Sequence, residues 1–96
     1  MNRQEALRVL TLAKPELMRN FGVVRLALFG SVARDEAQKG SDVDIVVSFA
    51  GPATSKSYFG VQFYLEDALG CPVDLVTDKA LRPELRQYIE QEAVNV

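Results

Sequence analysis

The chain has 96 residues, of which 48% are apolar and 25% are charged, and its formal net charge is -2. These values are typical of one globular domain and give no basic footprint for non-specific binding of nucleic acid. With one cysteine and no histidine, the chain cannot form an internal disulfide, a Cys/His zinc site or a histidine-activated nucleophile, so any metal must be held by oxygen ligands.

The first quarter of the sequence predicts helix. Residues 3–13 have the apolar spacing of a helix, with Asn2 as the N-cap. We expect Pro15 to interrupt this helix, because proline lacks the backbone donor that a continuing helix needs. A second helical piece is then expected to stop near Gly22.

Three runs rich in β-branched residues predict strands: Val23 to Phe29, Asp42 to Phe49 and Pro72 to Thr77. A short helix is expected from Ser31, and a longer one over residues 55–70. The order of these elements predicts an α/β (α+β) domain with a small mixed three-stranded sheet flanked by about four helices.

The end of the sequence predicts a last helix over residues 81–93, with Pro83 in its first turn and with Leu85, Tyr88 and Ile89 on one side. The final Val-Asn-Val could begin a fourth strand, but only three strands are predicted. Residues 1–96 are therefore expected to form a single domain.

Asp42 and Asp44 stand two apart at the start of the second predicted strand. Their side chains should project on the same face, about 7 Å apart, and could share one divalent ion. Asp74, flanked by apolar residues in the third strand, would join them if the two strands are neighbours. Converging carboxylates repel one another unless a cation lies among them. The alternative is that all three are solvated residues of a strand start and a sheet edge.

A Gly-Ser pair, Gly30 and Ser31, ends the first predicted strand. Backbone N–H groups at such a strand-to-helix turn point outward and favour phosphate. The other common phosphate motifs, GxxxxGK and GxGxxG, are absent from the sequence. A triphosphate on this turn would complement a magnesium ion held by the carboxylates.

The stretch GSVARDEAQKGSDVDI resembles the signature of the nucleotidyltransferase superfamily that includes DNA polymerase beta, and it is most similar to its smallest members, the minimal nucleotidyltransferases or MNT domains. The matching positions are Gly30, Ser31, Ala33, Arg34, Ser41, Asp42 and Asp44. The VDLV segment around Asp74 resembles the context of the third family carboxylate, and LRPELRQYIEQEAV resembles the closing helix of MNT proteins. The likeness covers nearly the whole chain.

The resemblance implies a two-metal reaction. Asp42 and Asp44 would bind two Mg²⁺ ions, and Asp74 would bind one of them and help to deprotonate the attacking hydroxyl. That hydroxyl would attack the α-phosphorus of a nucleoside triphosphate in line, with pyrophosphate leaving.

The resemblance also implies a nucleotide-binding set. Gly30 and Ser31 would bind the β- and γ-phosphates. Arg34 could reach the triphosphate or form a surface ion pair, and Ser41 could contribute to the site or cap the turn that presents the first aspartate. Asp35 stands where the family usually has glycine, and it is expected to add a negative charge beside the phosphate site.

MNT proteins commonly accompany an all-helical HEPN ribonuclease. The resemblance therefore implies an antitoxin of a toxin–antitoxin pair that transfers AMP from ATP to a hydroxyl, typically of tyrosine, on a partner HEPN toxin. Two alternatives stay open, a catalytically silent antitoxin that acts by contact and a transferase for small molecules. A cytoplasmic location without direct binding of nucleic acid or membrane is expected, since no apolar stretch approaches the roughly 20 residues that span a bilayer.

Overall fold

The computed structural model describes residues 1–96. Its elements, in chain order, are α1 (Arg3–Phe21), β1 (Val23–Phe29), α2 (Gly30–Ala33), β2 (Val43–Phe49), α3 (Ser55–Leu69), β3 (Val73–Thr77), the 3-10 helix η1 (Asp78–Ala80), α4 (Pro83–Glu92) and β4 (Val94–Asn95). The three predicted strands are confirmed, and each matches its predicted range to within one residue.

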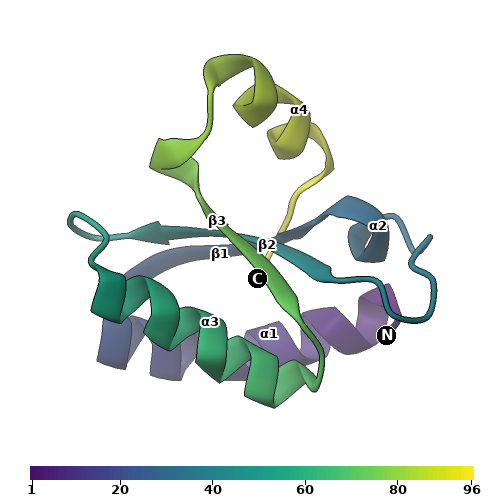
Figure 1. The fold of residues 1–96 in the computed structure, drawn as a ribbon, viewed down its shortest axis with the longest axis horizontal. Coiled ribbons are helices and arrows are strands. Elements are labelled where there is room, and N and C mark those ends of the chain that lie inside the picture. Colours follow the sequence, from purple (N-terminus) through teal and green to yellow (C-terminus); the bar gives the residue numbers. More distant parts are fainter.

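The strands form one mixed sheet in the order β3-β2-β1-β4 (Figure 1). β2 pairs with β3 in parallel, and β1 pairs with β2 and β4 antiparallel. The predicted count of three strands is wrong, because the end of the chain pairs with the free edge of β1. There the Val96 N–H donates to the Leu26 carbonyl at 3.1 Å, and Lys14 Nζ donates to the Val96 carbonyl at 2.6 Å.

The helices cover the two faces of the sheet unequally. α1 and α3 lie along one face, and α4 stands on the other (Figure 1). The hydrophobic core is a cluster of 18 buried residues that includes Leu28 and Ile45 of the sheet. Ala27 and Val46, paired across β1 and β2, are buried outside that cluster. Because neighbouring strand residues point to opposite faces, Asp44 shares the α4 face with Val46.

Helix α1 runs through Pro15 without interruption, so the predicted break is wrong. Its buried residues, Ala6, Leu10, Ala13 and Leu17, form one continuous inward face, while Pro15 lies on the exposed side. Proline inside a helix costs about 3 kcal/mol, whereas each buried leucine contributes about 1.5 to 3 kcal/mol. Packing against the sheet therefore outweighs the local preference at Pro15.

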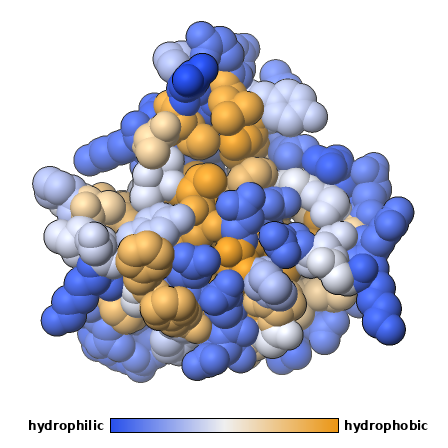
Figure 2. Space-filling model, viewed as in Figure 1, coloured by the Kyte–Doolittle hydropathy of each residue, from blue (hydrophilic) through white to orange (hydrophobic).

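Helix α4 begins at Pro83, two residues after the predicted start, and only one of the three apolar residues expected on one side of it is buried. Ile89 is 6% exposed, whereas Leu85 and Tyr88 are 52% and 63% exposed. Figure 2 shows apolar side chains gathered over α4 and continuing toward the middle of this face of the molecule. None of the helices has both the length and the apolar character required to cross a membrane.

Candidate functional site

Two of the predicted carboxylates lie side by side. Asp44 of β2 is in register with Asp74 of β3 in the parallel pair, so both side chains project on the α4 face. The pKa of Asp44 is raised from 3.8 to about 6, mainly by partial burial and then by the charge of Asp74, a hydrogen bond to Asp74 and the charge of Asp42, while the charge of Arg34 lowers it. The structure therefore holds unfavourable negative charge at this point of the sheet.

Asp42 precedes β2 and is exposed. Its charge reaches Asp44, but no three acidic or thiol side chains stand close enough together to hold a metal ion as they are placed. The donor set itself is suited to a hard cation, because all three groups are carboxylates and because positive charge would relieve the repulsion that raises the pKa of Asp44. The predicted three-carboxylate metal site stays a prediction.

Gly30 closes β1 and brings the backbone against this carboxylate pair. Its φ of 75° is in the left-handed region, and a Cβ added there would stand only 2.1 Å from Asp44 Oδ2. A residue with a side chain would be strained by its dihedral and would collide with the carboxylate. The close approach between the end of β1 and Asp44 of β2 therefore requires glycine at position 30.

A glutamate that the sequence did not single out completes the neighbourhood of Gly30. Glu92, the last residue of α4, accepts a hydrogen bond from the Gly30 N–H at 2.9 Å and another from Arg34 Nη1 at 2.8 Å. Arg34 also pairs with Glu36 at 3.1 Å, and its hydrogen bonds to Glu92 and then Glu36 raise its pKa. Of the two roles open to Arg34, the ion pair is the one present in this structure.

The remaining residues of the motif divide between the site and the backbone. Ser31 lies in the first turn of α2 and is partly exposed. The Ser41 hydroxyl accepts the Gln38 N–H at 3.1 Å, so it caps the turn before Asp42. Asp35 accepts the Arg3 N–H at 3.2 Å at the start of α1. Its carboxylate therefore contacts the start of α1, and the expected effect of its charge on the phosphate site stays a prediction.

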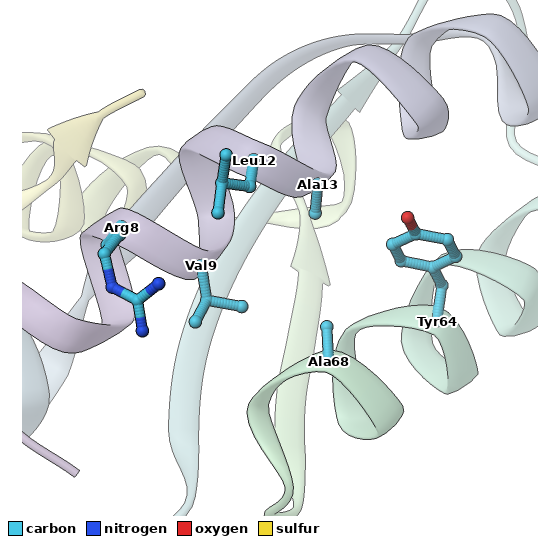
Figure 3. Close-up of a pocket in the computed structure, with 6 residues that line it drawn as sticks. All are labelled: Arg8, Val9, Leu12, Ala13, Tyr64 and Ala68. Atoms are coloured by element: carbon cyan, nitrogen blue, oxygen red, sulfur yellow. The ribbon is translucent and has the colours of Figure 1, made fainter.

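The carboxylates lie on an open surface. None of the four cavities of the structure is lined by Asp42, Asp44 or Asp74. One of these cavities, of about 350 Å³, is a groove between α1 and α3 that is lined by Arg8, Val9, Leu12 and Ala13 of α1 and by Tyr64 and Ala68 of α3 (Figure 3). This groove lies on the face of the sheet that α1 and α3 cover, so the sheet separates it from the carboxylates.

Residues 10–96 match the family model described as a nucleotidyltransferase domain. The protein adenylyltransferase MntA of Thermococcus cleftensis is 38% identical over 93 residues, which cover 97% of this chain and 94% of the relative. A Methanocaldococcus jannaschii protein assigned the same activity is 38% identical over 96 residues, covering 96% and 95% of the two chains.

Among solved structures, one assigned as a minimal nucleotidyltransferase has a TM-score of 0.84 and 36% identity, and the match covers 100% of this chain and 97% of the other. A complex of the tri-AMPylated Shewanella oneidensis HEPN toxin with its MNT antitoxin shares the fold, with a TM-score of 0.66, 24% identity and coverage of 95% and 70%. The resemblance predicted at the Gly30–Ile45 stretch is thereby confirmed, and the chain belongs to the nucleotidyltransferase family of enzymes.

Proposed function

We propose that residues 1–96 form a single minimal nucleotidyltransferase domain that transfers AMP from ATP to a hydroxyl of a HEPN-type partner, as the antitoxin of a toxin–antitoxin pair. The observation that carries this proposal is the pair of carboxylates, Asp44 and Asp74, in register beside the close approach of Gly30. The relative MntA, which is named as a protein adenylyltransferase, supports the choice of a protein acceptor.

The residues divide the work between the two ends of the nucleotide. The Gly30 N–H, the Ser31 hydroxyl and the Arg34 guanidinium are hydrogen-bond donors that suit the β- and γ-phosphates. Gly30 also contacts Asp44, so phosphates bound at Gly30 would place the α-phosphorus near the carboxylates. Positioning of this kind supplies most of the catalysis in phosphoryl-transfer enzymes.

The carboxylates suit Mg²⁺, with Asp44 and Asp74 as the adjacent ligands and the exposed Asp42 completing the set by rotation of its side chain. Bound Mg²⁺ would neutralise the charge that develops on the attacking and leaving oxygens. Asp74 is exposed, so it can receive the proton of an acceptor hydroxyl as the new bond to the α-phosphorus forms and the bond to pyrophosphate breaks.

An open site needs a second surface to hold the acceptor and to exclude water. No cavity surrounds the carboxylates, and α4 beside them exposes Leu85 and Tyr88. Exposed apolar side chains are common where protein partners bind. A partner that contacts this face would bring its own hydroxyl, such as that of a tyrosine, to the nucleotide.

The test is transfer of label from ATP to a purified HEPN-type partner protein. We expect label from α-³²P-ATP, and none from γ-³²P-ATP, to become covalently bound to the partner in the presence of Mg²⁺. Asp74→Asn should lower the rate by about 10² or more. Asp67→Asn should leave it unchanged, because Asp67 is an exposed carboxylate of α3, on the other side of the sheet.

The partner's ribonuclease activity separates this proposal from the alternatives. It should fall in parallel with modification, and mass spectrometry should find AMP on a tyrosine or another hydroxyl. Complete inhibition without ATP, or with Asp74→Asn at the same concentration, would show that contact alone neutralises the partner. Absence of label on the partner, with transfer of label to a small hydroxyl compound supplied in the assay, would indicate a small-molecule acceptor.

A further inference from the structure

The Glu92 carboxylate accepts hydrogen bonds from two of the donors that the proposed function assigns to phosphate binding. One oxygen accepts from the Gly30 N–H at 2.9 Å and the other from Arg34 Nη1 at 2.8 Å. A phosphate group carries the same negative charge and also divides its oxygens between neighbouring donors. Glu92 and a bound phosphate therefore cannot use these two groups at the same time.

The backbone on both sides of Glu92 is fixed. α4 ends at Glu92, where the Ala93 N–H donates to the Ile89 carbonyl at 2.9 Å, and β4 follows at once and pairs with β1. The preceding turn is held by Glu90, which pairs with Arg25 of β1 at 2.7 Å. Release of the two donors thus requires only that the Glu92 side chain, which is 20% exposed, rotates toward solvent.

We propose that Glu92 is an intramolecular competitor of the nucleotide, occupying the Gly30 and Arg34 donors in the free protein and being displaced when a nucleoside triphosphate binds. This inference rests on the proposed function and adds a regulatory residue to the same site. If the competing contact is formed in about 90% of free molecules, it weakens the apparent affinity for ATP about 10-fold. AMP, which lacks the β- and γ-phosphates, is not subject to this competition.

The test is isothermal titration calorimetry of Mg-ATP and of AMP with wild type and Glu92→Gln. We expect Glu92→Gln to lower the Kd for Mg-ATP about 10-fold and to leave the Kd for AMP unchanged. The matched control is Glu36→Gln, which removes the same charge from Arg34 but makes no contact with Gly30. It should change the Kd for Mg-ATP by less than about twofold, as expected for an exposed pair.

Three results would overturn the inference. Equal gains in Glu92→Gln and Glu36→Gln would mean that only net charge matters, and a weaker affinity in Glu92→Gln would mean that Glu92 positions Arg34 for the nucleotide. Failure of both folded proteins to bind Mg-ATP would instead remove the proposed function.

A second measurement uses the wild type alone and does not depend on the stability of a variant. On titration with Mg-ATP, the NMR resonances of the Gly30 amide and of Arg34 Nη1, the two donors to Glu92, should shift together as the nucleotide replaces the carboxylate. If Mg-ATP binds in calorimetry while both resonances stay unchanged, the contacts with Glu92 persist in the complex and the inference fails.

Discussion

Replacing Asp44 by asparagine tests whether the carboxylates are held for chemistry at a cost to the fold. Partial burial, the neighbouring charges and a hydrogen bond to Asp74 raise the pKa of Asp44 from 3.8 to about 6 in the folded, metal-free chain. The folded state then holds this proton more tightly than the unfolded state does. The metal-free protein therefore loses stability as the pH rises from about 4 to about 6 and keeps that loss above pH 6.

The size of the effect follows from the same values. A rise of the pKa from 3.8 to about 6 would correspond to about 3 kcal/mol if none of it were screened. Water reaches the Asp44 carboxyl, which is only partly buried, so we expect about 1 kcal/mol. In a domain of this size, that difference shifts the Tm by about 4 to 8 °C.

The assay is thermal unfolding in EDTA at pH 8 and at pH 4. Asp44→Asn should melt about 4 to 8 °C above the wild type at pH 8, and the gap should narrow at pH 4, where Asp44 is neutral in the folded state and partly protonated in the unfolded state. Mg²⁺ at pH 8 should stabilise the wild type more than the variant, since binding to the folded state raises its stability. Asp67→Asn, which leaves the pair intact, is the control. A lower Tm for Asp44→Asn at pH 8 would refute the reasoning, because it would make the carboxylate a structural contact.

Substitutions at three further positions test packing and backbone conformation. Gly60→Ala should destabilise the protein by about 1 to 3 kcal/mol in urea, because the new Cβ would lie 2.2 Å from Phe21 Cε1; the loss should disappear in a Phe21→Ala background. Asp35→Ala should cost about 1 kcal/mol more than Asp35→Gly, because φ is 59° there, and a change of more than twofold in the Kd for ATP in Asp35→Gly would place its charge at the phosphates. Gly30→Ala should lower the Tm more than Gly22→Ala: the two have φ values of 75° and 73°, but only Gly30 has a side-chain oxygen 2.1 Å from the added Cβ. Equal losses would show that this contact yields easily.

The strands and helix ends could be predicted because their signals are local. Runs such as Val23–Phe29 are long enough to specify a strand by composition. Gly22 and Gly70, both with φ of 73°, end α1 and α3 as the sequence indicated. The continuation of α1 through Pro15 could not be predicted in the same way. It depends on the burial of side chains against a sheet whose strands all lie later in the sequence.

The contacts of Glu92 with Gly30 and Arg34 could not be predicted from the sequence for a similar reason. Glu92 lies 62 positions from Gly30 and 58 positions from Arg34 in the sequence. The geometry of both contacts depends on the direction of α4. That direction is fixed by β4, only two residues long, whose pairing with β1 no periodicity reveals. A short terminal strand thus places a carboxylate at the site, and the final Val-Asn-Val of the sequence does not show which strand it pairs with.

The stretch from Gly30 to Asp44 contains residues that shape the backbone and residues predicted to bind metal or nucleotide. A match to the family motif does not distinguish these two kinds. Gly30, Asp35 and Gly40 have φ values of 75°, 59° and 88°, so each of these positions turns the chain in a way that glycine adopts most easily. Aspartate tolerates the left-handed region better than most residues, so Asp35 can adopt the positive φ that this position requires. Ser41 likewise serves the turn. The backbone at these positions therefore sets the presentation of the carboxylates, and the effect of the Asp35 charge on ATP binding is what Asp35→Gly tests.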